Sequence, residues 1–406
     1  MMGISQVVFQ YRAESSAWLC RCVSLLTICL LVMAGPARTS WAQSQFASGA
    51  KQAILIDAET GSILYQKNAD ELFAPASMSK LMTLAVVFKA IKAGQLKLTD
   101  EFTMSVNAWR TGGAPSRTSA MFVPVNTKAS LEDLIRGMII QSGNDAAICV
   151  AEGMAGSESA FAKLMTAEAR RIGLETSTFG NATGLAHPDQ KMTARELAKL
   201  GQFLIREYPD SYKIFSERNF KYRRHNFYNR NPLLFQDLGV DGLKTGYLEK
   251  AGYGMVASAI QGKRRLIAVT SGLDSAGDRR DETRKLLEWG FRSIGEFRLF
   301  DPGEVVGHAR VWGGAAMYVP LAGNENGVTV ALPRFPATQK IRAEVIYLKP
   351  IKAPVRKGDK VARLRVRSST SATSEVPLYA MEDVERVGVA RRGIDSLLVM
   401  ALGWLL

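Results

Sequence analysis

The feature that most constrains this chain is an apolar run, residues 80–91, that follows a proline and a Ser-x-x-Lys pair. Pro75 suits the entry to a helix, and the apolar run after it predicts a buried helix. Residues three apart share a helix face, so Ser77 and Lys80 should project together near the helix N-terminus. A serine hydroxyl needs a base beside it to act as a nucleophile. Lysine can be that base only when burial or a second cation lowers its pKa.

A Ser-x-x-Lys pair by itself is a weak signal, because most such matches combine a solvated serine with a surface lysine. Two more short motifs follow it in the chain. Ser142-Gly143-Asn144 lies in a predicted loop between two helical patterns, and Lys244-Thr245-Gly246 lies in a predicted strand. A chance occurrence of all three, in order and in fitting local contexts, is improbable.

These three motifs together are the signature of class A β-lactamases and penicillin-binding proteins. The chain resembles the low-molecular-weight penicillin-binding D-alanyl-D-alanine carboxypeptidases, the serine-type S11 peptidases. The fuller stretches Ile-Gln-Ser-Gly-Asn-Asp-Ala at 140–146, Asp-Gly-Leu-Lys-Thr-Gly at 241–246 and Ala251-Gly252-Tyr253 carry the resemblance. It implies an α/β (α+β) catalytic domain in which helices pack on an antiparallel sheet.

The resemblance also implies catalytic roles. Ser77 would attack the carbonyl between two terminal D-alanines of the peptidoglycan stem peptide, and Lys80 would take the hydroxyl proton. Ser142 would relay a proton to the leaving amine, and Asn144 would position Lys80 and the substrate amide. No metal or cofactor is implied, and β-lactam antibiotics are expected as covalent inhibitors.

A second group of residues is expected to bind substrate. Lys244 would keep Lys80 neutral and attract the terminal carboxylate, and Thr245 would donate its hydroxyl beside Gly246 of the same motif. The N–H groups of Ser77 and Tyr247 would hold the oxyanion. Tyr247 stands where relatives often carry His or Phe. Arg279 and Arg230 match family positions near the carboxylate, with surface salt bridges as the alternative for both.

Other functions share part of this pattern. A class A β-lactamase also needs a deacylating Glu, and no Glu with Leu-Asn at +3 and +4 occurs between Asn144 and Lys244. A D-alanyl-D-alanine endopeptidase is closer and is poorly separated by sequence. A non-catalytic wall scaffold would not need the intact motifs. A lipid-binding function, which the C-terminal residues alone suggest, would leave the motifs unexplained.

Both ends of the chain indicate export and membrane contact. Residues 1–42 predict a secretory signal peptide, with cleavage after Ala42; an uncleaved anchor is the alternative. Residues 381–406 predict an amphipathic helix that lies in a membrane interface, and a helix docked on the core is the alternative. We therefore expect an exported, peripheral protein on the periplasmic face of the bacterial inner membrane.

Composition fits two domains, predicted at 43–299 for the catalytic part and 300–380 for an all-β part with Gly and Pro turns. The formal net charge is +14, but the basic residues are spread out, which argues against a nucleic-acid partner. Cys149 is the one cysteine after residue 42 and should be a core residue. The three histidines, His187, His225 and His308, match no zinc spacing.

Overall fold

The computed structural model describes residues 4–7, 46–334, 340–348, 350–369 and 372–388. The predicted signal peptide lies outside these ranges apart from Ile4–Val7, which form strand β1 beside β15 (Ile341–Ile346). Residues 389–406 of the predicted amphipathic helix also lie outside them, so the signal peptide and this part of the helix stay predictions. The predicted helix start at 381 is wrong, because residues 381–388 are not helical and pair through Val384 with Val355 and through Arg386 with Gly314. Within the described ranges, no helix combines the length and the apolar character that crossing a bilayer requires.

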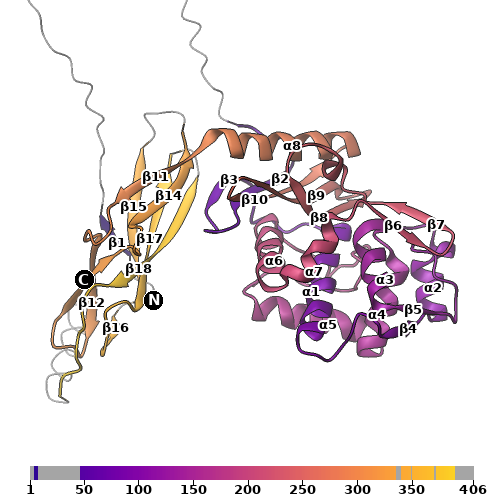
Figure 1. Ribbon diagram of the computed structural model, residues 1–406, viewed down its shortest axis with the longest axis horizontal. Coiled ribbons are helices and arrows are strands. Elements are labelled where there is room, and N and C mark those ends of the chain that lie inside the picture. The colour runs from indigo at the N-terminus through magenta and orange to yellow at the C-terminus, as the bar shows by residue number, and fades with distance from the viewer. Residues whose placement is uncertain (1–3, 8–45, 335–339, 349, 370–371, 389–406) are drawn as a thin grey trace, which may run out of the picture.

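The molecule has two lobes (Figure 1). The helical lobe, residues 46–293, combines helices with an antiparallel sheet, and the β lobe, residues 294–388, consists of strands. Helix α8 (Ala276–Ser293) and strand β11 (Ile294–Phe300) carry the chain from one lobe to the other. The predicted fold class, an α+β part followed by an all-β part, is confirmed. The predicted boundary at 299/300 stays a prediction.

The sheet of the helical lobe is buried on both faces because its strands are apolar in both alternating sets of positions. In β2, Ile54 and Ile56 join the core beneath α6, whereas Leu55 joins the core beneath α8. The strand order is β3-β2-β10-β9-β8, so β8 lies at the end of the sheet. The strands are β2 (Gln52–Asp57), β3 (Ile63–Lys67), β8 (Val240–Leu248), β9 (Gly252–Gln261) and β10 (Arg264–Leu273).

Side-chain caps start most of the longer helices. Ser130-Leu-Glu-Asp has the residue pattern of a helix N-terminus, and Ser130 Oγ accepts a hydrogen bond from the Asp133 N–H at 3.1 Å. Ser157, Thr193 and Ser275 cap α5, α6 and α8 in the same way. The remaining helices are α1 (Lys80–Lys92), α2 (Val106–Gly112), α3 (Leu131–Arg136), α4 (Asn144–Ala155), α5 (Glu158–Arg171), α6 (Ala194–Glu207) and α7 (Pro209–Tyr212). Two short strand pairs complete the lobe: β4 (Glu101–Thr103) with β5 (Lys128–Ser130), and β6 (Asn219–Tyr222) with β7 (His225–Tyr228).

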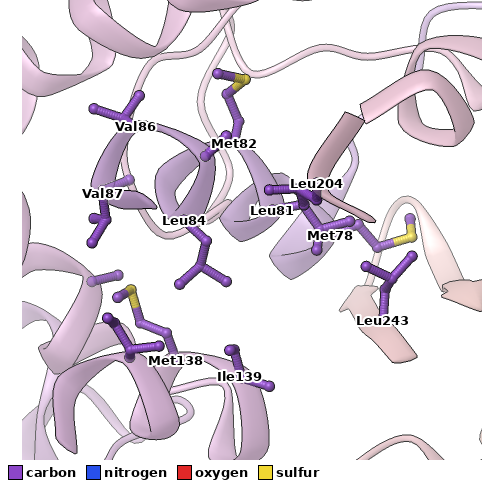
Figure 2. Close-up of a cluster of buried hydrophobic side chains, with 14 of the residues drawn as sticks. Met78, Leu81, Met82, Leu84, Val86, Val87, Met138, Ile139, Leu204 and Leu243 are labelled. Atoms are coloured by element: carbon purple, nitrogen blue, oxygen red, sulfur yellow. The ribbon is translucent and has the colours of Figure 1, made fainter. Parts of the chain in front are cut away.

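Helix α1 runs through the middle of the core. Its residues from Lys80 to Phe88 are all buried, which fits a helix that is apolar around most of its circumference. Figure 2 shows its side chains in one cluster with Met138 and Ile139, with Leu204 of α6 and with Leu243 of β8. The helix that begins at Lys80 is therefore fixed on several sides.

Three elements differ from what the local sequence favours. The composition of the Gly- and Ser-rich stretch at 110–119 favours a loop, but α2, which Ser105 caps at the Ala108 N–H, extends into it as far as Gly112. The helical pattern after Ser130 continues to about residue 140, but the structure changes to a π-helix at Gly137–Gln141. A helical pattern is evident from residue 281, but α8 already begins at Ala276, because Ser275 Oγ accepts the Asp278 N–H and caps the helix there.

The β lobe has its own apolar core of Val, Leu and Ala side chains. It touches the helical lobe where Thr373 of β18 pairs with Ile63 of β3, and where the hydroxyls of Ser62 and Ser374 lie 2.7 Å apart. A single run of paired strands thus continues from one lobe into the other. The further strands of the β lobe are β12 (Gly307–Trp312), β13 (Tyr318–Ala322), β14 (Val328–Pro333), β16 (Ile351–Lys352), β17 (Lys360–Ser368) and β18 (Thr373–Ala380).

Candidate active site

Ser77 lies in a 3₁₀ turn, Ala76–Ser79, that leads directly into α1. The turn is held tightly against neighbouring backbone. A Cβ on Gly184 would lie 2.0 Å from the Ala76 carbonyl oxygen, and a Cβ on Gly246 would lie 2.9 Å from the Pro75 carbonyl oxygen. Glycine at both positions lets the 184 loop and the end strand β8 approach the serine from two sides.

Lys80 is fully buried and is held by three oxygen atoms. Its Nζ lies 3.0 Å from Ser77 Oγ, 2.7 Å from Asn144 Oδ1 and 2.5 Å from the Thr183 carbonyl oxygen. Ser77 and Lys80, which were predicted to share one helix face, are therefore in direct contact. Asn144 of the second motif joins it at the N-terminus of α4.

The environment of Lys80 favours the neutral amine. Burial and, to a smaller extent, the nearby Arg230 guanidinium lower its pKa from 10.5 to about 7, against opposing effects of Glu158 and Asp145. At neutral pH a large share of the molecules therefore carry a lysine with a free lone pair. That is the condition for Lys80 to accept a proton from the Ser77 hydroxyl, 3.0 Å away.

The second motif is built around a tight turn. Ser142 is buried and has a φ of +63°, at the point where the π-helix ends and α4 begins. Asn144 donates its Nδ2 to Thr118 Oγ1 at 2.9 Å, and its backbone N–H donates to the Ser119 carbonyl at 2.7 Å. The buried carboxylate of Asp145 accepts the N–H groups of Met121 and Val123 and so fixes the loop that carries Thr118 and Ser119.

The third motif lies on the end strand β8. Lys244 is buried, and its Nζ donates to the Thr245 carbonyl at 3.2 Å. Burial lowers the pKa of Lys244 well below its ordinary value, and Lys80, Arg230 and Arg279 lower it further. Thr245 is buried beside it. Tyr247 is half exposed, and its ring centroid lies 4.2 Å from that of Tyr253.

Arg230 and Arg279 approach this lysine pair from different elements. Arg230 follows β7 and donates to Ser119 Oγ at 2.5 Å, and Arg279 in α8 lies over the Tyr253 ring at 5.6 Å. Burial lowers the pKa of both guanidinium groups, and among the described residues neither group has a carboxylate partner. The Nε of Arg279 is buried without a hydrogen-bond partner in this part of the chain. The salt-bridge interpretation of both residues is thus not observed, and the site concentrates positive charge suited to an anion.

Sequence reasoning missed the loop contacts of this site. Thr183 contributes only a backbone carbonyl, which no side-chain motif can reveal, and Thr118 and Ser119 belong to no recognised signature. Asn181 holds the Thr183 loop by accepting the N–H groups of Thr183 and Gly184. Asn181-Ala182-Thr183 also matches a glycosylation sequon, a pattern that does not indicate this structural role. Cys149 is buried in the core, as predicted, and burial raises its pKa to about 12.

Comparison with known proteins gives consistent matches over both lobes. Residues 39–275 match the family model of D-alanyl-D-alanine carboxypeptidase, and residues 296–386 match that of the penicillin-binding protein 5 C-terminal domain. The D-alanyl-D-alanine carboxypeptidase DacC of Escherichia coli is 39% identical over 86% of this chain and 88% of its own.

Solved structures agree. Penicillin-binding protein 5 from Haemophilus influenzae is 34% identical, with a TM-score of 0.69 over 84% of this chain and 99% of its own. Penicillin-binding protein D2 from Listeria monocytogenes, solved in an ampicillin-bound form, is 28% identical, with a TM-score of 0.54 over 62% of this chain and 100% of its own. This chain belongs to the D-alanyl-D-alanine carboxypeptidases, serine-type hydrolases of the low-molecular-weight penicillin-binding protein family.

Proposed function

We propose that this chain removes the terminal D-alanine from peptidoglycan stem pentapeptides through an acyl-enzyme on Ser77. The observation that carries the proposal is the contact between Ser77 and Lys80. A hydroxyl lies 3.0 Å from a fully buried amine whose pKa burial brings to about 7. A serine beside a base that is neutral at working pH has the properties of an activated nucleophile.

In the acylation step, Ser77 Oγ bonds to the carbonyl carbon between the two D-alanines while its proton passes to Lys80. The resulting oxyanion accepts hydrogen bonds from the N–H groups of Ser77 and Tyr247. The carbon–nitrogen bond then breaks, and Ser142 relays a proton to the leaving D-alanine amine. Asn144 holds Lys80 and the substrate amide in place. Water finally hydrolyses the ester, and Ser77 recovers its proton.

The terminal carboxylate of the substrate would lie against Lys244, Thr245, Arg279 and Arg230. The two guanidinium groups support this role because neither has a carboxylate partner of its own among the described residues, although Arg279 is only partly buried and Arg230 is exposed. Gly246 lets β8 approach the nucleophile, so that a peptide along this strand can reach Ser77. β-Lactams would acylate the same serine, in line with the ampicillin-bound relative.

Release of D-alanine from a soluble pentapeptide that ends in D-Ala-D-Ala tests the proposal. We expect residues 43–406 to release one D-alanine per peptide, as measured by mass spectrometry. Penicillin should abolish this activity. Ser77→Ala should abolish both D-alanine release and penicillin labelling. A peptide that ends in D-Ala-L-Ala serves as the matched substrate control.

Other results would redirect the assignment. Cleavage of cross-linked muropeptides in preference to the pentapeptide would indicate an endopeptidase, and rapid penicillin turnover would indicate a β-lactamase. Activity or labelling that survives in Ser77→Ala would contradict the role of Ser77.

We also propose that the chain is exported and attaches to the periplasmic face of the inner membrane through its C-terminal helix. The support is the sequence pattern of residues 1–42 and 381–406. Residues 43–406 should sediment with anionic phospholipid vesicles, whereas residues 43–388 should stay in solution. Equal binding of the two chains would contradict the proposed anchor.

A further inference from the structure

The three partners of Lys80 do not offer it equivalent hydrogen bonds. The Thr183 carbonyl can only accept, and Asn181 holds its loop through the N–H groups of Thr183 and Gly184. Ser77 Oγ can accept or donate. Asn144 can present either its Oδ1 or its NH₂ group to Lys80, depending on the orientation of the amide. The direction of the Lys80 lone pair therefore depends on that orientation.

A neutral lysine has two N–H donors and one lone pair. When Asn144 Oδ1 and the Thr183 carbonyl each accept an N–H, the lone pair is left for the third partner, Ser77 Oγ, at 3.0 Å. The hydroxyl must then donate to the amine, which is the arrangement that general-base catalysis needs. With the amide reversed, Nδ2 of Asn144 would donate to the lone pair, and Lys80 could not accept the proton of Ser77.

A short chain of hydroxyls sets the orientation of this amide. Ser116 Oγ donates its one proton to the Gly113 carbonyl at 2.7 Å, so toward Thr118 Oγ1, also at 2.7 Å, it can only accept. Thr118 must therefore donate its hydroxyl proton to Ser116 Oγ. Toward Asn144 Nδ2, at 2.9 Å, Thr118 Oγ1 can then only accept. The amide consequently turns its NH₂ group to Thr118 and its Oδ1 to Lys80.

We propose that Thr118, backed by Ser116, is a positioning residue that fixes the amide of Asn144 and so directs the lone pair of Lys80 at Ser77. This inference rests on the proposed function of Ser77 and Lys80. Thr118 lies on an exposed loop, so its side chain can be changed without disturbing the core. A substitution there tests the hydrogen-bond chain and not the fold.

The test compares Thr118→Val, which keeps the shape of the side chain but removes its hydroxyl, with Thr118→Ser, which keeps the hydroxyl. Single-turnover acylation by a fluorescent penicillin and steady-state turnover of the pentapeptide are measured on residues 43–406. We expect Thr118→Val to lower the acylation rate and kcat about tenfold or more, with KM within about twofold of wild type. Thr118→Ser should restore most of the rate, and Ser116→Ala should fall between the two.

Thr111→Val is the matched control, because Thr111 is an exposed threonine at the end of α2 whose hydroxyl donates only to the Asn107 carbonyl. It should leave kcat and KM unchanged. The proposal is overturned if Thr118→Val acylates within about twofold of wild type, or if Thr118→Ser is as slow as Thr118→Val. It is also overturned if KM rises while kcat stays constant, since the hydroxyl would then bind substrate directly. Failure of the wild-type chain to be labelled would contradict the proposed function instead.

Discussion

The two lobes bury different kinds of polar side chain. In the described part of the β lobe the buried polar side chains are two serines, Ser368 and Ser374. The helical lobe buries Lys80 and Lys244 almost completely, and both pKa values are lowered. An unpaired buried charge opposes folding. The β lobe avoids this cost, whereas the helical lobe accepts two buried lysines at the candidate active site.

Two buried carboxylates of the helical lobe have charged or backbone N–H partners, although burial still raises the pKa of Asp145. Asp57 pairs with Arg264 at 3.1 Å, and Asp145 accepts backbone N–H groups from Met121 and Ala146. Among the described residues, Lys244 has only the Thr245 carbonyl as a hydrogen-bond partner, whereas Lys80 has three oxygen partners. Of the two buried lysines, Lys244 is thus the less compensated.

The largest effect is expected for Lys244→Met, which should change activity and stability in opposite directions. Loss of the amine proposed to bind the substrate carboxylate should lower kcat/KM about 10²-fold or more. Folding no longer has to bury or deprotonate this amine, so the free energy of unfolding at neutral pH should rise by about 1 kcal/mol or more. Thermal unfolding and D-alanine release measure the two effects. The exposed Lys250→Met is the control and should change neither; a Lys244→Met chain less stable than wild type would break the comparison.

The second prediction concerns two glycines, one in each lobe. Gly184→Ala and Gly358→Ala both place a side chain at positive φ, +82° and +90°, which costs about 1 kcal/mol. Only Gly184→Ala adds a clash, with the Ala76 carbonyl at 2.0 Å, so we expect a total loss of about 3 kcal/mol and slower acylation. Urea unfolding of both variants measures this. Equal losses of unfolding free energy at the two positions would mean that the turn at Ser77 moves to relieve the clash more easily than its packing indicates.

The third prediction is that acylation depends on the protonation of Lys80. Its rate should rise with pH through about 7, because only the neutral amine accepts the Ser77 proton. Arg230 lowers the pKa of Lys80, whereas Glu158 and Asp145 raise it. Arg230→Gln should therefore move the midpoint of the pH profile upward, and Glu158→Gln should move it downward. Shifts of both midpoints in the same direction would contradict this account.

The same pKa predicts a pH effect on stability. The pKa of Lys80 is about 7 in the folded chain and ordinarily 10.5, so between these values the unfolded state binds more protons. The contribution of Lys80 to the free energy of unfolding should therefore increase as pH rises through this window. Chemical denaturation at several pH values, with Lys80→Met as reference, isolates this contribution.

The smallest effect is expected in the β lobe for Glu375→Gln. Glu375 pairs with Arg363 at 3.0 Å and Arg365 at 2.6 Å, but all three side chains are partly exposed. Such pairs contribute less than about 1 kcal/mol, and kcat/KM should not change. A loss comparable to that of Gly184→Ala would show that the β lobe also depends on individual charges.

Sequence patterns were sufficient for the framework of the molecule. The apolar run after Pro75 predicted α1, the N-cap pattern at Ser130 indicates α3, and the strand predicted for Lys244-Thr245-Gly246 is β8. The three motifs located the residues that meet around Lys80. These features depend on neighbours close in sequence or on the periodicity of one element, and a sequence displays both directly.

The remaining features depend on contacts between distant segments. The Thr183 carbonyl reaches Lys80 across 103 positions, and Asn144 reaches Thr118 across 26. A backbone carbonyl has no residue type to recognise, and a threonine in a Gly- and Ser-rich stretch resembles any loop residue. The change to a π-helix after Arg136 also has no local signature, yet it sets the turn that carries Ser142.

The pairing of Thr373 with Ile63 has a mechanical consequence. Strand β11 carries the chain from α8 into the β lobe, and through β18 this lobe also pairs with β3, at the end of the helical lobe's sheet opposite to β8. A lobe joined only by a covalent linker could reorient freely relative to its neighbour, whereas a second contact restricts this reorientation. Under the proposed C-terminal anchoring, the length of the β lobe would therefore set the distance between Ser77 and the membrane.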